Sequence, residues 1–293
     1  MSEKVQGNHI VLKEYIHEKE YKDLTELSNV CTSNDDIILK LELDYKLNVA
    51  KESENNNNLV NEFLYYINDE VVSYIGISCF GGNVAELNGM TNPKYRKEGL
   101  FKKLFQLAMD ECRRRNYNEI LLLSDNASES GNEFIKLNGG VYKCSEYSME
   151  YMSGDKLINN NSKVISLKKA DKTDSDEIKN QDAIYWGKDL GEGEIEFIPN
   201  TDIYMIKKSD NIIGKINVEY DEDYAYIFGF GIKPEYRCNG YGRAALIEVV
   251  NTIIEKGIKN IKLDVACENI TALNLYKECG FEQKSVMNYY KIL

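Results

Sequence analysis

The chain contains one short motif twice, and a constant interval separates the two copies. "NPKYRKEGLFKKLF" begins at Asn92, and "KPEYRCNGYGRAAL" begins at Lys233. Four pairs of identical residues lie 141 positions apart: Pro93 and Pro234, Arg96 and Arg237, Gly99 and Gly240, and Gly139 and Gly280. Self-similarity at the scale of a domain predicts two copies of one folding unit.

Chain length and a polar tract agree with this division. The 293 residues exceed the usual size of one domain, and a hydrophobic content of 43% suffices for two buried cores. The turn-rich segment "SGDKLINNNSK", which starts at Ser153, is typical of a linker between domains. We therefore predict an N-terminal domain over 1–153 and a C-terminal domain over 162–293.

The order of elements is the same in both halves. In the second half, three β-branched and aromatic runs, "DIYMIKK", "NIIGKINVEY" and "YAYIFGFGI", are typical of antiparallel strands. From Arg243 onward the apolar residues recur at helical spacing, and Gly257 is a plausible helix stop. A strand, a short helix and a last strand, "SVMNYYKIL", complete the half. The predicted fold class is α/β (α+β), with a mixed, mostly antiparallel central sheet flanked by helices in each domain.

Composition narrows the functional classes. A net charge of −12 and a pI near 4.9 disfavour nucleic acid. They favour cationic partners, or are simply those of an ordinary acidic cytosolic protein. Seven scattered cysteines without a C-x-x-C pair argue against a disulfide framework and a zinc cluster. The only histidines, His9 and His17, lie far from the repeated motif, so we expect no metal and no cysteine nucleophile. No segment is apolar enough for a leader or a membrane span, so we expect a cytoplasmic protein.

The second copy of the motif predicts an anion site. A strand that runs into R-x-x-G-x-G and then into an amphipathic helix brings several backbone N–H groups, near Cys238 to Gly242, to a helix N-terminus. The helix dipole favours phosphate there, and Gly240 and Gly242 let it approach the backbone. A glycine-rich turn without any ligand is the alternative.

Two motifs of the second half resemble those of the GNAT superfamily of N-acetyltransferases. "GIKPEYRCNGYGRAALIEVV" is similar to the acetyl-CoA-binding motif of that family. "ENITALNLYKECGF" resembles its next motif in order and separation, with these residues in matching places: Asn269, Ala272, Tyr276, Gly280 and Phe281. The first half matches the same pattern less faithfully, so the whole chain resembles a tandem GNAT protein.

The resemblance implies a set of site residues for the second half. The loop would bind the pyrophosphate of acetyl-CoA through Arg237, Cys238, Asn239, Gly240, Tyr241 and Gly242. The preceding strand would diverge from its neighbour, so that backbone groups near Gly231 and Ile232 hold the pantetheine arm and stabilise the oxyanion. Tyr276 would give a proton to the departing thiolate. Asn269 would bind the cofactor arm or cap a helix, and Arg237 would contact phosphate or brace the loop.

The implied function is transfer of an acetyl group from acetyl-CoA to a primary amine of a small molecule or peptide, by direct attack and without a metal. The alternative is a non-catalytic protein that binds acetyl-CoA as a sensor or assembly module. The sequence leaves the oligomeric state open. Four acidic residues remain as weak candidates for a general base: Glu194, Glu196, Glu219 and Asp221.

The two copies differ at three matching positions. Phe101 replaces Gly242, Ile135 replaces Tyr276, and Ser128 replaces Asn269. The first copy therefore lacks the proton donor and the amide. These differences predict catalysis in the C-terminal domain and a degenerate cofactor loop in the N-terminal one.

Overall fold

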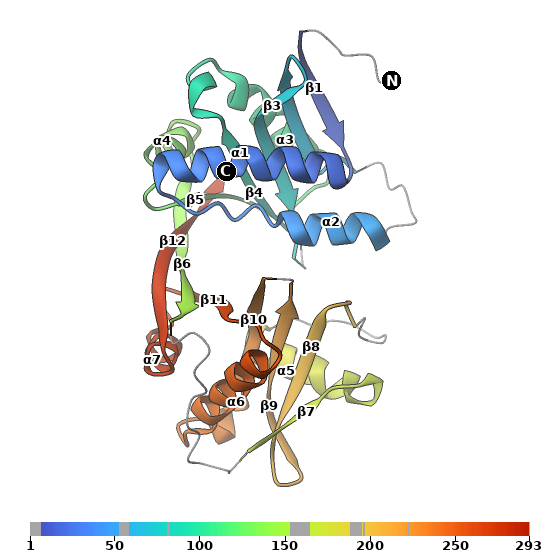
Figure 1. Ribbon diagram of the computed structural model, residues 1–293, viewed down its shortest axis with the longest axis vertical. Coiled ribbons are helices and arrows are strands. Elements are labelled where there is room, and N and C mark those ends of the chain that lie inside the picture. The colour runs from blue at the N-terminus through green and yellow to red at the C-terminus, as the bar shows by residue number, and fades with distance from the viewer. Residues whose placement is uncertain are drawn as a thin grey trace. The chain divides into compact units, whose positions relative to one another are not determined.

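A computed structural model describes residues 7–52, 59–80, 83–152, 165–187, 195, 197–221 and 223–292 (Figure 1). The chain forms two compact units. Unit 1 comprises Met1–Ser145 and Ser285–Leu293, and unit 2 comprises Glu146–Lys284. Each unit has its own set of neighbouring strands and its own hydrophobic core.

The sheet of unit 1 is antiparallel except for one pair of strands. Neighbouring strands pair in the order β1 (Asn8–Lys13), β2 (Glu62–Ile67), β3 (Glu70–Ser78), β4 (Val84–Thr91), β5 (Glu119–Asp125) and β12 (Phe281–Ile292). Only β4 and β5 run parallel. A parallel pair needs a crossover connection, which α3 (Leu100–Arg114) supplies.

Helices cover both faces of this sheet, because successive residues of a strand point to opposite faces. Phe63 and Tyr65 pack with α3, whereas Leu64 and Tyr66 pack with α1 (Glu18–Asp35). Figure 1 shows α1 lying across the front of the strands. Two further helices belong to this unit, α2 (Leu43–Glu52) and α4 (Glu129–Leu137).

Unit 2 repeats the arrangement. Its strands pair in the order β6 (Val141–Tyr151), β11 (Asn260–Ala266), β10 (Tyr224–Ile232), β9 (Asn211–Tyr220), β8 (Thr201–Lys208) and β7 (Ser166–Lys169). Only β10 and β11 are parallel. The connection between them is α6 (Tyr241–Glu255), and α5 (Ser175–Trp186) and α7 (Ile270–Glu278) complete the unit. The predicted mixed, mostly antiparallel fold is therefore confirmed in both units.

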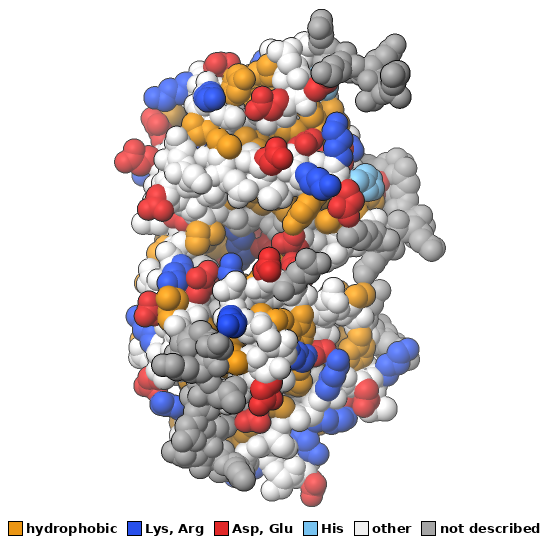
Figure 2. All heavy atoms as spheres, in the orientation of Figure 1, with side chains coloured by type: hydrophobic (Ala, Val, Ile, Leu, Met, Phe, Trp, Pro, Cys, Tyr) orange, Lys and Arg blue, Asp and Glu red, His pale blue; other side chains and the backbone are white. Residues whose placement is uncertain are grey.

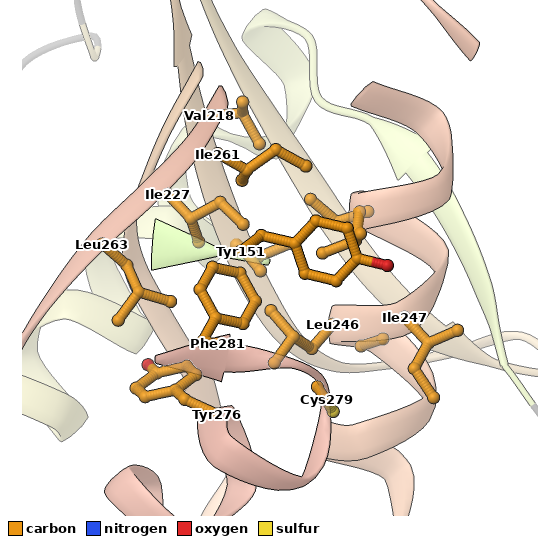
Figure 3. Packing of buried hydrophobic residues seen from close by; sticks show 14 of the residues in the cluster. Tyr151, Val218, Ile227, Leu246, Ile247, Ile261, Leu263, Tyr276, Cys279 and Phe281 are labelled. Carbon is orange, nitrogen blue, oxygen red and sulfur yellow. The ribbon is translucent and has the colours of Figure 1, made fainter. Parts of the chain in front are cut away.

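The main core of unit 2 lies between its sheet and α6. Ala245, Leu246, Val249 and Val250 of α6 are fully buried there. Figure 3 shows aliphatic side chains of β10, β11 and α6 around the rings of Tyr151 and Phe281. Gly257, with φ of 90°, follows the helix at the predicted stop.

The last strand of each sequence half belongs to the unit of the other half. Residues Glu146 to Glu150 of β6 pair with β11 in unit 2, and Met287 to Ile292 of β12 pair with β5 in unit 1. The predicted domains 1–153 and 162–293 divide the chain by its repeat, and they remain a proposal. The compact units divide it by contacts between residues instead.

The visible surface carries a mixture of charges. Acidic and basic side chains are interspersed over the face shown in Figure 2. Among the helices of the described residues, none combines the length and the apolar character that a membrane span needs.

Candidate active site

The glycine loop of unit 2 has an open backbone at the start of α6. Cys238 and Gly240 adopt left-handed φ values of 60° and 78°, and Gly240 is the N-cap of the helix. No side chain caps this end, and a Cβ on Gly240 would have no heavy atom within 4 Å. The first N–H groups of a helix have no partner inside it. Those of Tyr241, Gly242 and Arg243 are therefore available to an anion, as helix N-termini generally are.

Two side chains of the loop stabilise its backbone through hydrogen bonds to carbonyl oxygens. The Nε of Arg237 donates to the carbonyl oxygen of Ile232 at 2.8 Å, and the Nδ2 of Asn239 donates to the carbonyl oxygen of Arg237 at 2.8 Å. In unit 1, the Nε of Arg96 makes the matching bond to the carbonyl of Thr91 at 3.1 Å. Both copies thus use the arginine as a brace. A phosphate contact by Arg237 remains a proposal.

Strands β10 and β11 separate just before this loop. Their parallel pairing ends at Ile227 and Leu263, although β10 continues to Ile232. A register shift against β9 lies between Phe228 and Gly231, and Gly229 has a φ of 56°. Such a bulge bends the strand and interrupts its ladder of hydrogen bonds. Backbone groups around Gly231 are thereby placed beside the gap between the strands.

Unit 1 lacks this bulge. The pairing of β3 with β4 runs without a register shift from Ser73 to Ser78. The sequences of the two strands differ in length. The segment from the alanine to the motif proline is "AELNGMTNP" in unit 1, ending at Pro93, and "AYIFGFGIKP" in unit 2, ending at Pro234, which is one residue longer. The extra residue is the bulge. The constant spacing of the motif residues themselves hides this extra residue in the sequence.

Tyr276 lies on α7, in the main core of unit 2. The side chain is 8% exposed, and its ring centroid lies 6.1 Å from that of Phe281. Burial alone raises the pKa of Tyr276 to about 12. In Figure 3 the hydroxyl points toward the side of β11, away from α6. At neutral pH the phenol is therefore protonated, the state that a proton donor requires.

Asn269 caps α7. Its Oδ1 accepts a hydrogen bond from the N–H of Ala272 at 3.1 Å. Ser128 does the same for α4 of unit 1, where its Oγ accepts from the N–H of Gly131. The capping role is therefore common to both copies. A contact between Asn269 and the cofactor arm remains a proposal.

Phe101 fills the matching gap in unit 1. Its ring packs edge to face against Phe134, with centroids 4.9 Å apart, and a Cβ on Gly89 would lie 2.8 Å from it. In unit 2 a Cβ on the corresponding Gly242 would make only ordinary van der Waals contacts, at 3.6 to 3.7 Å, with Phe230, Ile232 and Leu275. The loop backbones are alike, since Lys97 and Gly99 have φ values of 66° and 79°. The copies therefore differ in the space beside the loop.

The α5 side of the unit 2 strands holds a polar cluster that no sequence motif marks. Lys215 of β9 is buried and pairs with Asp182 of α5, with 2.8 Å between Nζ and Oδ1. Burial lowers the pKa of Lys215, and the bond to Asp182 opposes that shift. The ring of Tyr185 occupies the space where Gly231 would carry a Cβ. Helix α5 is thus held directly against the bulge.

The Asp182→Asn variant tests this pair. Removing the counter-charge leaves a buried ammonium without compensation, which destabilises a protein strongly. Because Asp182 is 17% exposed, water offsets part of the loss, and we expect about 2 kcal/mol less free energy of unfolding by urea denaturation at pH 7. The pKa of Lys215 falls further in the variant. The Lys215 ammonium therefore loses its proton at a lower pH in the folded state than in the unfolded state. The deficit should therefore shrink as the pH rises toward 10.

Glu278→Gln is the control, since the Arg243–Glu278 pair is more than half exposed on both sides and exposed pairs contribute little. An equal loss in both variants, or a deficit in Asp182→Asn that does not change with pH, would contradict the assignment.

The residues considered as a general base or as metal ligands do not gather at one place in the described part of the chain. Glu219 of β9 pairs with Tyr226 of β10, and Asp221 follows β9. Glu194 and Glu196 lie outside the described residues. His17 caps α1 and His9 stacks on Tyr66. In the part of the chain that the structure describes, no three metal-ligating side chains gather at one place.

Comparison with known proteins gives consistent results for both halves. Residues 21–136 and 163–281 each match the model of the acetyltransferase (GNAT) family. The ribosomal protein bS18-alanine N-acetyltransferase of Escherichia coli is 32% identical over 69 residues, which are 23% of this chain and 47% of that protein. A putative enzyme of the same description from Bacillus subtilis is 30% identical over 106 residues, 36% of this chain and 70% of that protein. The chain thus spans about half the length of the curated relatives that it matches first.

Solved structures agree over nearly the whole length. A GCN5-related N-acetyltransferase from Sphaerobacter thermophilus has a TM-score of 0.78 at 15% identity, covering 97% of this chain and 95% of its own. A tandem GNAT protein from the clavulanic acid biosynthesis pathway has a TM-score of 0.71 at 10% identity, covering 97% and 98%. At sequence identities of this size, structural similarity to these proteins shows that the fold is shared and nothing about activity. With the family model matched twice and the two units built alike, this chain belongs to the acetyltransferase (GNAT) family, as a tandem member.

Proposed function

We propose that unit 2 binds acetyl-CoA and transfers its acetyl group to an amine of a small molecule or peptide. The observation that carries the proposal is the uncapped N-terminus of α6 beside the bulged strand β10, where β10 and β11 separate. Only unit 2 combines this gap with a tyrosine on the following helix. The family match supports the reaction class.

The residues present fit a pyrophosphate. Gly240 has open space around it, and the N–H groups of the first helical turn point outward with the positive end of the dipole. Cys238 and Asn239 lie exposed in the same turn. We assign the loop from Arg237 to Gly242 to phosphate binding, and the backbone at Gly231 and Ile232 to the pantetheine arm.

Acetyl-CoA supplies an activated acyl carbon with a thiolate leaving group. Tyr276 holds its proton at neutral pH, because burial raises its pKa to about 12. It therefore suits protonation of the sulfur, not removal of a proton from the amine. Unit 1 has Ile135 at that place, Phe101 in the gap and no bulge, so we assign it a supporting role.

The acceptor is proposed from two observations. The relatives from Escherichia coli and Bacillus subtilis are described as alanine N-acetyltransferases of a ribosomal protein, the second as a putative one, so we include N-terminal amines among the candidates. The net charge of −12 favours cationic acceptors such as polyamines and basic peptides.

Release of free thiol from acetyl-CoA tests the proposal. We expect release above the background rate with at least one member of a panel of polyamines, aminoglycosides, amino acids and alanine-initiated peptides. Thermal stabilisation by acetyl-CoA without product from any amine would favour the non-catalytic alternative, a sensor or assembly module. Absence of both stabilisation and product would contradict binding as well.

A further inference from the structure

The side chain of Asn217, on β9, is buried without a hydrogen-bond partner for its oxygen. The residue is 9% exposed, and no donor in the described part of the chain reaches its Oδ1. Buried polar atoms are nearly always paired in proteins, so an orphaned one requires an explanation. The neighbouring cation cannot provide it, since Lys215 is paired with Asp182.

Asn217 lies at the bulge of β10. It pairs in register with Phe228, where β10 parts from β11. A Cβ on Gly229 would lie 2.5 Å from its Nδ2, so the glycine leaves room for the amide. Because Asn217 is two residues from Lys215 in one strand, its side chain lies on the α5 face of the sheet.

The matching position of unit 1 has neither the amide nor the space. Gly76 lies 141 positions before Asn217. A Cβ there would lie 2.3 Å from the hydroxyl of Tyr74 and 2.8 Å from the Nζ of Lys46. The strand opposite Gly76 also has no bulge. The amide, the bulge and Tyr276 therefore occur together in one copy.

We propose that Asn217 binds the acceptor, with its Oδ1 accepting a hydrogen bond from the attacking amine. This inference rests on the proposed function of unit 2. An amide oxygen only accepts, so its ligand must supply an N–H or an O–H, and an acetyl group has neither, whereas an attacking amine has an N–H. A neutral amine that donates one N–H to Oδ1 keeps its lone pair for the acyl carbon. As the new C–N bond forms, the C–S bond breaks, and the amine then releases its extra proton to solvent or a base.

The first test is stability, which needs no acceptor. Asn217→Leu replaces an unpaired buried amide by an apolar side chain of similar size, so Tm should rise by about 2 to 4 °C. Asn88→Leu is the matched control on β4. Its amide is satisfied, with 2.6 Å from Nδ2 to the carbonyl of Lys40 and 2.8 Å from the N–H of Gly89 to Oδ1, so Tm should fall. An unchanged or lower Tm for Asn217→Leu would overturn the inference.

The second test separates the amine from the coenzyme. Thiol release from acetyl-CoA is measured with and without methylamine as the probe. Asn217→Leu should lower the methylamine-dependent rate about tenfold, the effect of one lost hydrogen bond, and leave coenzyme affinity unchanged. Asn217→Asp, which keeps an acceptor oxygen, should restore most of the rate. Weaker coenzyme binding in Asn217→Leu would assign Asn217 to the coenzyme, and an unchanged methylamine-dependent rate would remove it from the acceptor site; either result would refute the proposal. If the wild-type protein released no thiol at all, the proposed function would fail, and the stability test would still decide the role of Asn217.

Discussion

Replacing Gly240 by aspartate is expected to weaken binding of coenzyme A by at least about a hundredfold. The new carboxylate would stand at the start of α6, where a phosphate must reach the N–H groups of the first turn. Each charge-assisted hydrogen bond lost costs about 1.5 to 3 kcal/mol, and like-charge repulsion adds to this. Calorimetric titration with coenzyme A measures the change directly.

Gly99→Asp is a closely matched control. Gly99 is also an N-cap, its φ is 79° against 78° for Gly240, and neither glycine has a heavy atom within 4 Å of the added Cβ. Both variants therefore take on the same backbone strain, about 1 kcal/mol. Their stabilities should fall alike while only Gly240→Asp loses coenzyme. If Gly99→Asp lost binding instead, the chemistry would belong to unit 1.

Replacing Tyr276 by phenylalanine is expected to lower kcat about a hundredfold with little change in coenzyme affinity. The hydroxyl is needed as the thiolate leaves, and a positioned acid contributes a factor of about 10² or more. With a pKa of about 12, this group stays protonated from pH 7 to 10, so wild-type turnover should not fall over that range through its titration. Steady-state kinetics of the amine found in the screen provide the measurement.

Tyr290→Phe shows what a purely structural tyrosine does. Both tyrosines are 8% exposed, but the hydroxyl of Tyr290 donates to Oδ1 of Asn132 at 3.1 Å. Tyr290→Phe should therefore lose about 1 kcal/mol of stability and keep its turnover. Tyr276→Phe should retain its stability, because burial alone shifts the pKa of Tyr276 and its hydroxyl has no hydrogen-bond partner among the described residues. Normal turnover in Tyr276→Phe would refute the assignment of this residue.

The sequence by itself determined the repeat, the fold class and the loop. Those features follow from local rules, because glycine at a left-handed φ, proline before a turn and a helical apolar period act over a few residues. Gly240 as the N-cap of α6 and Gly257 after its end are particular cases.

Tertiary structure decided what depends on residues far apart in the chain. The pairing of β12 with β5, the place of the ring of Phe101 and the contact of Tyr185 with Gly231 all depend on how distant segments pack. The burial that isolates Asn217 and raises the pKa of Tyr276 has the same origin, since desolvation is set by every segment that surrounds a group. The motifs locate the loop, and packing around it determines which copy has space for a ligand.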